Sequence, residues 1–289
     1  MPLKDDAIVL LDGARTPIGT FLGGLKSVTP TELGVFAARG ALERSKVDPA
    51  DVDSIYFGNV LQSAKDTAYI ARHVGLRSGI PTETPALTVN RACASGLDAI
   101  IEGSRALRVG DATVVLAGGA ENMSMMPYAM RGVREGWKMQ RSDVDDMLFS
   151  ALHDPEAGCS IAETVEHLAQ ARDIGREAAD EAALISQQRA ARAAKNGVFA
   201  QEIVPVDVRG RGGRSKRFEH DENLRPETTM EALSALPPLF GPQGRVTAGN
   251  SSGLNDAGAA MVLTTGKVAK ERGYPVLGEL CGWSAVGVA

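Results

Sequence analysis

Apolar and polar positions alternate in blocks between residues 7 and 122, and the blocks switch between the two periods of regular structure. Short apolar runs bounded by Gly, Pro or Asn indicate strands, and apolar residues three and four positions apart indicate helices. The predicted strands are 7–17, 54–60, 86–90 and 112–122, and the predicted helices are 30–45, 66–79 and 95–110. Such alternation predicts an α/β domain with crossover helices packed on a sheet.

Two capping boxes mark helix starts, each with a Ser or Thr followed three residues later by Glu. They are Thr29 with Glu32, and Ser160 with Glu163. A long Ala-rich helix from about Arg176 ends at an Asn-Gly stop at 196–197. Because the α/β pattern pauses over 122–245 and then resumes, we expect an inserted domain there, within a core domain of 1–121 and 246–272.

Composition excludes several classes of function. The net charge of −5 provides no general basic field for nucleic acid or anionic membrane. No apolar run approaches the roughly 20 residues of a membrane helix, and the N-terminus has no signal-peptide pattern. The three cysteines are far apart without a CxxC pair, which argues against a disulfide framework or a zinc site. We therefore expect a cytoplasmic protein without a metal.

Cys93 stands where a predicted strand passes into a predicted helix. Small residues surround it: Ala92, Ala94, Ser95 and Gly96. A helix N-terminus lowers a thiol pKa, and backbone N–H groups there can bind an oxyanion. Free cysteines are also common as small buried hydrophobic residues. Local chemistry leaves both roles open, nucleophile and structural thiol. In the helix that follows, spacing puts Leu97, Ile100, Ile101 and Leu107 on one face.

Four segments, in order along the chain, resemble the thiolase family. They are "ARTPIGTFLGGL" from Ala14, "PALTVNRACASGLDAI" around Cys93, "GGAENMSMMPY" from Gly118 and "GRVTAGNSSGLNDAGAA" from Gly244. The resemblance implies the layered α/β thiolase fold, a mixed sheet flanked by helices with an inserted loop domain. It also implies acyl transfer between acyl-CoA thioesters, by Claisen condensation or thiolysis, with Cys93 as the nucleophile that forms an acyl-cysteine.

The resemblance further implies the residues that meet the substrate. The positions expected at CoA or the acyl group are Ser252, Ala248, Arg225, Phe240, Leu148 and Met123. CoA is a substrate here, so no separate cofactor is expected. By family analogy we expect the chain to form a homo-oligomer. Its net charge and the lack of a long apolar run predict that it binds neither nucleic acid nor membrane. The basic loop at 209–226 is either a contact for a phosphorylated nucleotide or a solvated surface loop.

The chain also departs from the thiolase pattern. Its 289 residues contain no Gly-His-Pro motif, no Cys-x-Gly-Gly-Gly segment and no Asn-Glu-x-Phe-Ala motif, and 273–289 resembles only the start of the family's C-terminal domain. We therefore expect the chain to be incompetent alone. Two explanations stay open: a separate chain supplies the C-terminal half, or the chain is a truncated gene product. The alternative is a non-catalytic thiolase-like half that binds CoA or a partner chain. A lone half would expose an apolar face and a strand edge.

Weaker candidates have simpler roles beside the functional ones. Met123 is suited either to an acyl pocket or to core packing. Asn255 and Asp256 are expected to hold the "GNSSGLND" turn by local side-chain bonds. Cys159 and Cys281 are expected to be structural, and the four histidines to lie on surfaces or loops.

Overall fold

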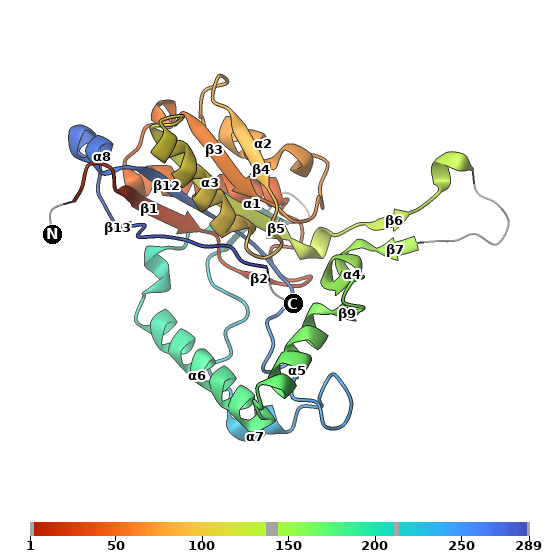
Figure 1. Ribbon diagram of the computed structural model, residues 1–289. Coiled ribbons are helices and arrows are strands. Elements are labelled where there is room, and N and C mark those ends of the chain that lie inside the picture. Colours follow the sequence, from red (N-terminus) through yellow and green to blue (C-terminus); the bar gives the residue numbers. More distant parts are fainter. Residues whose placement is uncertain (1–2, 137–143, 211–213, 288–289) are drawn as a thin grey trace. The chain divides into compact units, whose positions relative to one another are not determined.

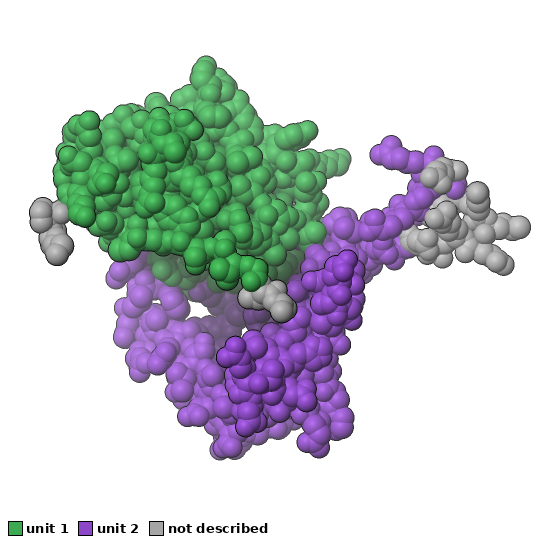
Figure 2. Space-filling view, in the orientation of Figure 1, with its two compact units in different colours: residues 1–125, 202–220, 255–289 green, residues 126–201, 221–254 purple. Residues whose placement is uncertain are grey.

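The computed structural model describes residues 3–136, 144–210 and 214–287, and it has the α/β architecture that the sequence predicts (Figure 1). Part of the basic loop, residues 211–213, lies outside the described residues. The chain divides into two compact units (Figure 2). Unit 1 comprises 1–125, 202–220 and 255–289, and unit 2 comprises 126–201 and 221–254.

A mixed sheet forms the centre of unit 1. Its strands are β1 (Ile8–Arg15), β2 (Gly19–Thr20), β3 (Ser54–Gly58), β4 (Ala86–Val89), β5 (Val114–Asn122), β12 (Asn255–Thr265) and β13 (Gly278–Glu279). The order is β13-β1-β12-β5-β3-β4, with β2 paired to β12. β12 is antiparallel to both β1 and β5, whereas β3 is parallel to β4 and β5. The carboxyl ends of β3, β4 and β5 therefore meet at one edge of the sheet.

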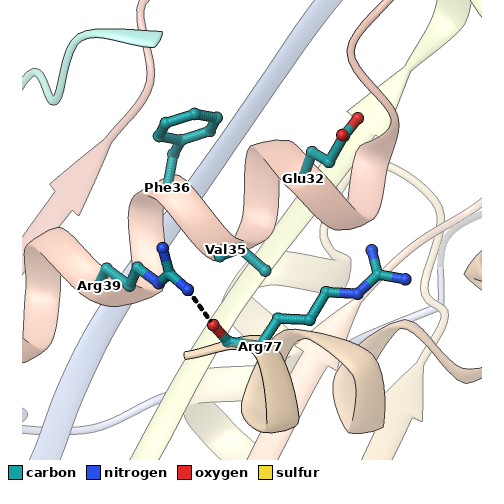
Figure 3. Close-up of a pocket in the computed structure, with 5 residues that line it drawn as sticks. All are labelled: Glu32, Val35, Phe36, Arg39 and Arg77. Carbon is teal, nitrogen blue, oxygen red and sulfur yellow. Dashed lines mark hydrogen bonds between the residues drawn. The ribbon is translucent and has the colours of Figure 1, made fainter. Parts of the chain in front are cut away.

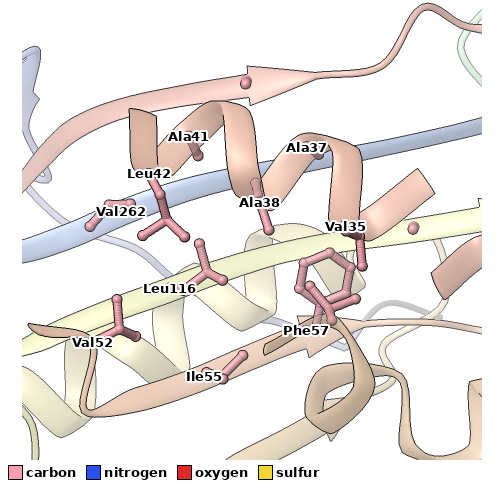
Figure 4. Packing of buried hydrophobic residues seen from close by; sticks show 14 of the residues in the cluster. Val35, Ala37, Ala38, Ala41, Leu42, Val52, Ile55, Phe57, Leu116 and Val262 are labelled. Atoms are coloured by element: carbon pink, nitrogen blue, oxygen red, sulfur yellow. The ribbon is translucent and has the colours of Figure 1, made fainter. Parts of the chain in front are cut away.

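Helices cover both faces of this sheet. They are α1 (Pro30–Ser45), α2 (Ile70–Arg77), α3 (Ser95–Val109) and α8 (Gly266–Arg272), and unit 1 also has the hairpin of β10 (Val206–Arg209) and β11 (Ser215–Phe218). Successive strand residues point to opposite faces. Accordingly Leu116 packs with α1 in one apolar cluster, whereas Val115 packs with α3 in another. Figure 4 shows the first cluster, where α1 presents Ala38 and Leu42 to the sheet.

Unit 2 is built from helices and short hairpins. The helices are α4 (Met147–Leu152), α5 (Ile161–Ala171), α6 (Arg176–Lys195) and α7 (Met230–Ser234). The hairpins are β6 (Tyr128–Met130) with β7 (Val144–Asp146), and β8 (His153–Asp154) with β9 (Cys159–Ser160). None of the described helices in either unit is both long and apolar enough to cross a membrane.

Both predicted capping boxes are present. The Thr29 hydroxyl accepts a hydrogen bond from the Glu32 backbone N–H at 3.2 Å, and the Glu32 carboxylate accepts one from the Thr29 N–H at 2.9 Å. Ser160 and Glu163 make the same reciprocal pair at the start of α5. Each box satisfies two donors that the first helical turn leaves unpaired.

The apolar face predicted for α3 is partly wrong. Leu107 is buried, but the Leu97 side chain is 68% exposed. The buried side of α3 instead uses small residues such as Ala99 and Gly103, which let the helix lie close to the sheet. A Cβ on Gly103 would be 2.7 Å from a methyl group of Val115. An exposed Leu87 on the edge strand β4 adds to the apolar surface of unit 1.

The compact units are bounded differently from the domains that the sequence predicts. Residues 202–220 lie within the predicted insertion, yet they group with the sheet of unit 1. Two backbone hydrogen bonds attach this segment to β1. The Arg15 N–H donates to the Glu202 carbonyl at 2.9 Å, and the Val204 N–H donates to the Arg15 carbonyl at 2.8 Å. The domain bounds given above stay a prediction about folding units.

Candidate functional site

Cys93 lies just beyond the carboxyl end of β4, in a turn that leads directly into α3. Its side chain is exposed. Ala92, the residue before it, has a φ of +45°, in the left-handed region that costs a non-glycine residue about 1 kcal/mol or more. The first residue of α3, Ser95, closes the turn. Its hydroxyl accepts from the Arg91 N–H at 2.8 Å and donates to the Ala92 carbonyl at 2.6 Å.

Two strand glycines allow α3 to begin so close to the sheet. A Cβ on Gly58, the last residue of β3, would lie 2.6 Å from the carbonyl carbon of Ser95. A Cβ on Gly119 of β5 would lie 3.3 Å from the Cα of Gly96. Real Cβ atoms almost never approach another atom as closely as 2.6 Å. A side chain at Gly58 would therefore displace the start of the helix and the turn that carries Cys93.

One ion pair accompanies the start of α3. The Arg91 guanidinium lies 3.0 Å from a carboxylate oxygen of Asp98, which is buried in the first turn of the helix. An acidic side chain near a helix N-terminus is favourable because the unpaired N–H groups there carry partial positive charge. The pair ties the approach to Cys93 to the body of α3.

Glu121 lies at the same edge of the sheet as Cys93, at the end of β5. Its carboxylate accepts hydrogen bonds from the N–H groups of Val60 at 2.8 Å and Leu61 at 3.3 Å, and from the Asn59 amide at 3.1 Å. Burial raises the pKa of the Glu121 carboxyl to about 6, although these three hydrogen bonds act in the opposite direction. Neither Glu121 nor Asn59 was found from the sequence. The signal was a carboxylate that ends a long apolar strand.

Met123 is half-buried where β5 ends. The Asn255 N–H lies 3.3 Å from its sulfur, a contact that fits packing against β12. The hydrogen bonds described for Asn255 and Asp256 reach distant segments rather than their own turn. The Asn255 amide donates to the Gly19 carbonyl at 3.0 Å, and Asp256 accepts from the Ser124 hydroxyl at 2.6 Å. Strand pairing, not turn geometry, therefore explains these bonds.

In unit 2, Ala248 and Ser252 are exposed on the loop that follows residue 244. Asn250 organises this loop. Its side-chain oxygen accepts from the Thr247 N–H at 2.8 Å, and its amide donates at 2.9 Å to both the Arg245 carbonyl and an Asp180 carboxylate oxygen. The local side-chain bonds expected of the loop are thus made by Asn250.

Two charged groups anchor the same loop to helices. Glu166 of α5 accepts hydrogen bonds from the N–H groups of Arg245 at 2.8 Å and Val246 at 2.9 Å, and the Arg245 guanidinium lies 3.6 Å away. Burial raises the pKa of Glu166, but these hydrogen bonds and the positive charge outweigh it, so the pKa is lowered overall. Asp180 of α6 is only 1% exposed and pairs with Arg176 at 2.7 Å.

The remaining predicted contacts also belong to unit 2. Leu148 is buried in α4, where the Asp146 side chain caps the helix by accepting from the Leu148 N–H. Phe240 is half-buried in a loop, and the Arg225 side chain is exposed. The Arg225 N–H donates to the Gln187 side chain of α6 at 2.9 Å. Cys93 and Met123 lie in unit 1, so the structure places the predicted residues in two groups, one in each unit.

A surface pocket of about 340 Å³ lies elsewhere, on α1 and the end of α2. Its lining residues are Glu32, Val35, Phe36, Arg39 and Arg77 (Figure 3). The Arg39 guanidinium donates to the Arg77 carbonyl. No predicted site residue lines this pocket. Across the described ranges, His, Cys, Asp and Glu side chains nowhere gather in a group of three or more that could hold a metal ion.

Comparison with known proteins gives one consistent result. The family model for the thiolase N-terminal domain matches residues 8–267. Human mitochondrial 3-ketoacyl-CoA thiolase is 44% identical over 282 residues, which cover 97% of this chain and 70% of that protein. A beta-ketothiolase of Cupriavidus necator is 43% identical, over 97% of this chain and 71% of its own length.

Solved structures agree with the sequence comparison. A crystal structure of the human mitochondrial 3-ketoacyl-CoA thiolase in complex with CoA has a TM-score of 0.90 and 43% identity, and covers 96% of this chain and 69% of that one. The acetyl-CoA acetyltransferase of Bacillus anthracis has a TM-score of 0.94 at 39% identity, over 98% of this chain and 71% of that one.

Proposed function

Because the chain belongs to the thiolase family, we propose that it transfers acyl groups between CoA thioesters through an acyl-cysteine at Cys93. The single observation that carries the assignment of Cys93 is its place in the fold. An exposed thiol stands at the carboxyl ends of parallel strands and at the first turn of a helix. Ligands of open α/β sheets commonly bind at such edges.

The chemistry follows from the thiol and the helix start. The Cys93 thiolate attacks the thioester carbonyl, a new carbon–sulfur bond forms, and the CoA thiolate leaves and takes up a proton. In the second step, either a CoA thiolate (thiolysis) or the α-carbanion of another acyl-CoA (condensation) attacks the acyl-cysteine and frees Cys93. N–H groups in the first turn of α3 are suited to stabilise the carbonyl oxygen as charge develops.

The proposed contacts for CoA and its acyl group rest on the family resemblance. They are Ser252, Ala248, Arg225, Phe240, Leu148 and Met123. The exposure of Ala248 and Ser252 supports a role in contacting a ligand, whereas the burial of Leu148 supports a role in shaping a pocket wall. CoA binding by Ser252→Tyr, measured by calorimetry beside Ser251→Tyr as a neighbouring control, tests the loop. Equal affinities for the two variants would remove Ser252 from the proposal.

Selective labelling tests the nucleophile. Iodoacetamide is expected to alkylate Cys93 faster than the exposed Cys281 and the buried Cys159 of the same molecule, as measured by peptide mass spectrometry. Acetyl-CoA is expected to leave an acetyl group on Cys93, and Cys93→Ser to abolish it. Alkylation of Cys93 no faster than that of Cys281, without acetylation, would instead favour the non-catalytic half that binds CoA or a partner chain.

The assembly and location belong to the same proposal. A homo-oligomer, a separate chain that supplies the C-terminal thiolase half, and a cytoplasmic location are predictions. Light scattering on the purified chain measures whether it forms a homo-oligomer. The need for a separate C-terminal chain is tested by adding a polypeptide that carries the Gly-His-Pro and Cys-x-Gly-Gly-Gly motifs and assaying thiolysis. Full activity of this chain by itself would contradict the need for such a partner.

A further inference from the structure

Glu121 is the carboxylate at the end of β5, and the acyl transfer described above gives it no role. Its three hydrogen-bond donors, two backbone N–H groups and the Asn59 amide, carry no formal charge. Burial of the Glu121 carboxylate, with no cationic side chain among its described partners, costs free energy. This cost is the reason for its raised pKa. A buried carboxylate with a raised pKa, at the sheet edge where Cys93 lies, is typical of a functional site rather than of packing alone.

A continuous line of hydrogen bonds runs from Glu121 to the turn of Cys93. Glu121 accepts from the Val60 N–H at 2.8 Å. The carbonyl of the same residue, Val60, accepts from the Asn90 side-chain amide at 3.1 Å. The Asn90 side-chain oxygen in turn accepts from the Ala92 N–H at 3.0 Å. Ala92 is the residue with positive φ that immediately precedes Cys93.

The other bonds of this region fix the same strands. The Asn59 N–H donates to the Val89 carbonyl at 3.2 Å, which extends the pairing of β3 with β4. The Asn59 amide also donates to the Ala120 carbonyl at 3.0 Å, which connects β3 to β5. Glu121 therefore binds the segment after β3, and the Val60 carbonyl of that segment accepts the hydrogen bond from Asn90.

We propose that Glu121 is a positioning residue for the Cys93 nucleophile, acting through the Val60 backbone and the Asn90 side chain on the strained turn at Ala92. This inference rests on the proposed function, because it gives Glu121 a role in the reactivity of Cys93. The unusual conformation of Ala92 persists only where surrounding bonds determine it. Without the hydrogen bonds to Glu121, the turn at Ala92 relaxes and the Cys93 sulfur moves away from the start of α3.

Glu121→Gln tests the inference with a clear sign. The amide keeps the size of the side chain, but its NH₂ group cannot accept a hydrogen bond from a backbone N–H. Removing a negative charge near a thiol favours the thiolate, so charge alone would make Cys93 more reactive. Positioning predicts the opposite. We expect iodoacetamide to alkylate Cys93 about fivefold more slowly in the variant, relative to Cys281 of the same molecule.

Asn90→Ala is the second variant, and it lies on the exposed turn where a change of fold is least expected. It should slow alkylation of Cys93 by a similar factor. Glu121→Gln added to Asn90→Ala should have little further effect, because both residues act through one line of bonds. Glu83→Gln, at an exposed position, is the control for a change of charge and should leave the rate unchanged.

Hydrogen exchange supplies a readout of the geometry itself. In Glu121→Gln we expect faster exchange at the Ala92 N–H as well as at Val60 and Leu61. A folded Glu121→Gln or Asn90→Ala variant in which Cys93 reacts at the wild-type rate would overturn the inference and leave the proposed function intact. If wild-type Cys93 reacts no faster than Cys281, the proposed function fails, and the inference fails with it.

Discussion

Two loops are held by the same hydrogen-bond pattern with opposite electrostatics: the segment after β3, which is hydrogen-bonded to Asn90 near Cys93, and the loop that carries Ala248 and Ser252. In unit 1, Glu121 accepts hydrogen bonds from the successive N–H groups of Val60 and Leu61. In unit 2, Glu166 accepts from the successive N–H groups of Arg245 and Val246. The guanidinium of Arg245 accompanies Glu166, and the pKa of Glu166 is lowered. Among the described residues, the donors that bind Glu121 carry no formal charge, and burial raises its pKa to about 6.

The difference teaches how one hydrogen-bond pattern yields two responses to pH. With a cation nearby, the charged carboxylate is the stable form, and the loop that carries Ala248 and Ser252 keeps these hydrogen bonds at neutral pH and down to about pH 4.5. Without a nearby cation, burial disfavours the ionised form of Glu121, and the hydrogen bonds from N–H groups offset that cost only in part. The loop near Cys93 is thus closer to a change of protonation at neutral pH than the loop of unit 2.

Removing a charge from the unit 2 network should have the largest effect. Arg176→Ala leaves the buried Asp180 without its ionic partner and deprives the Leu233 and Leu236 carbonyls of a donor. We expect a loss of about 3–5 kcal/mol in the free energy of unfolding, measured with urea. Arg192→Ala, at an exposed position of the same helix, is the control and should cost less than about 0.5 kcal/mol. A small loss in Arg176→Ala would show that charge does not hold this loop.

Glu166→Gln should have the next largest effect, about 2–3 kcal/mol at neutral pH. The folded-state pKa of Glu166 is lower than its ordinary value of 4.5. Its contribution is therefore complete above pH 4.5 and is lost as the pH falls through the lower folded-state value. Urea unfolding from pH 7 to acid should show a steeper loss in the wild type than in Glu166→Gln. Parallel curves would remove Glu166 from the comparison.

Glu121 should respond to pH with the opposite sign. Its folded-state pKa of about 6 exceeds the ordinary value of 4.5, so the folded protein binds more protons across that window. The free energy of unfolding should then fall as the pH rises through the range around 4.5 to 6, by about 2 kcal/mol in total. Glu121→Gln should remove this fall, which urea unfolding at a series of pH values would detect. An unchanged pH profile in the variant would mean that Glu121 titrates normally.

The smallest effects concern the two capping boxes, one in each unit. Thr29→Ala and Ser160→Ala should each cost about 1 kcal/mol of stability in the helix that the residue caps. α1 packs many residues into the core of unit 1, whereas Ala169 is the one residue of α5 that is buried. Thr29→Ala should therefore lower the free energy of global unfolding, and Ser160→Ala should mainly increase hydrogen exchange in the first turn of α5. Equal global losses would contradict this distinction.

Local rules predicted the local features well. The capping boxes at Thr29 and Ser160 depend on residues three positions apart, and both form. The strands β1, β3, β4 and β5 and the helices α1, α2 and α3 follow from hydrophobic period together with bounding Gly, Pro and Asn residues. The prediction that Leu97 lies on the buried face of α3 was wrong because Gly103 determines which face packs on the sheet. A glycine has no side chain, so it gives no signal in a hydrophobic pattern.

The features of the candidate site that the sequence did not predict depend on strand register. Glu121 meets Val60 only because β3 and β5 are parallel with Gly58 beside Gly119. Asp256 reaches Ser124 because β12 pairs with β5 at Asn122. No spacing within one segment encodes a partner 61 or 132 residues away. Cys93 itself was identified by motif, and its supporting residues were not.

The position of β12 at the centre of the sheet has a consequence for synthesis. The strands described as neighbours of β1 are β12 and β13, which follow residue 254. A nascent chain that has emerged only as far as β5 therefore displays β1 with two open edges, since its partners are not yet made. The turn of Cys93 can assemble early from β3, β4 and β5. The sheet around it closes late, and the interval is when a ribosome-bound chain is most exposed to aggregation and to chaperones.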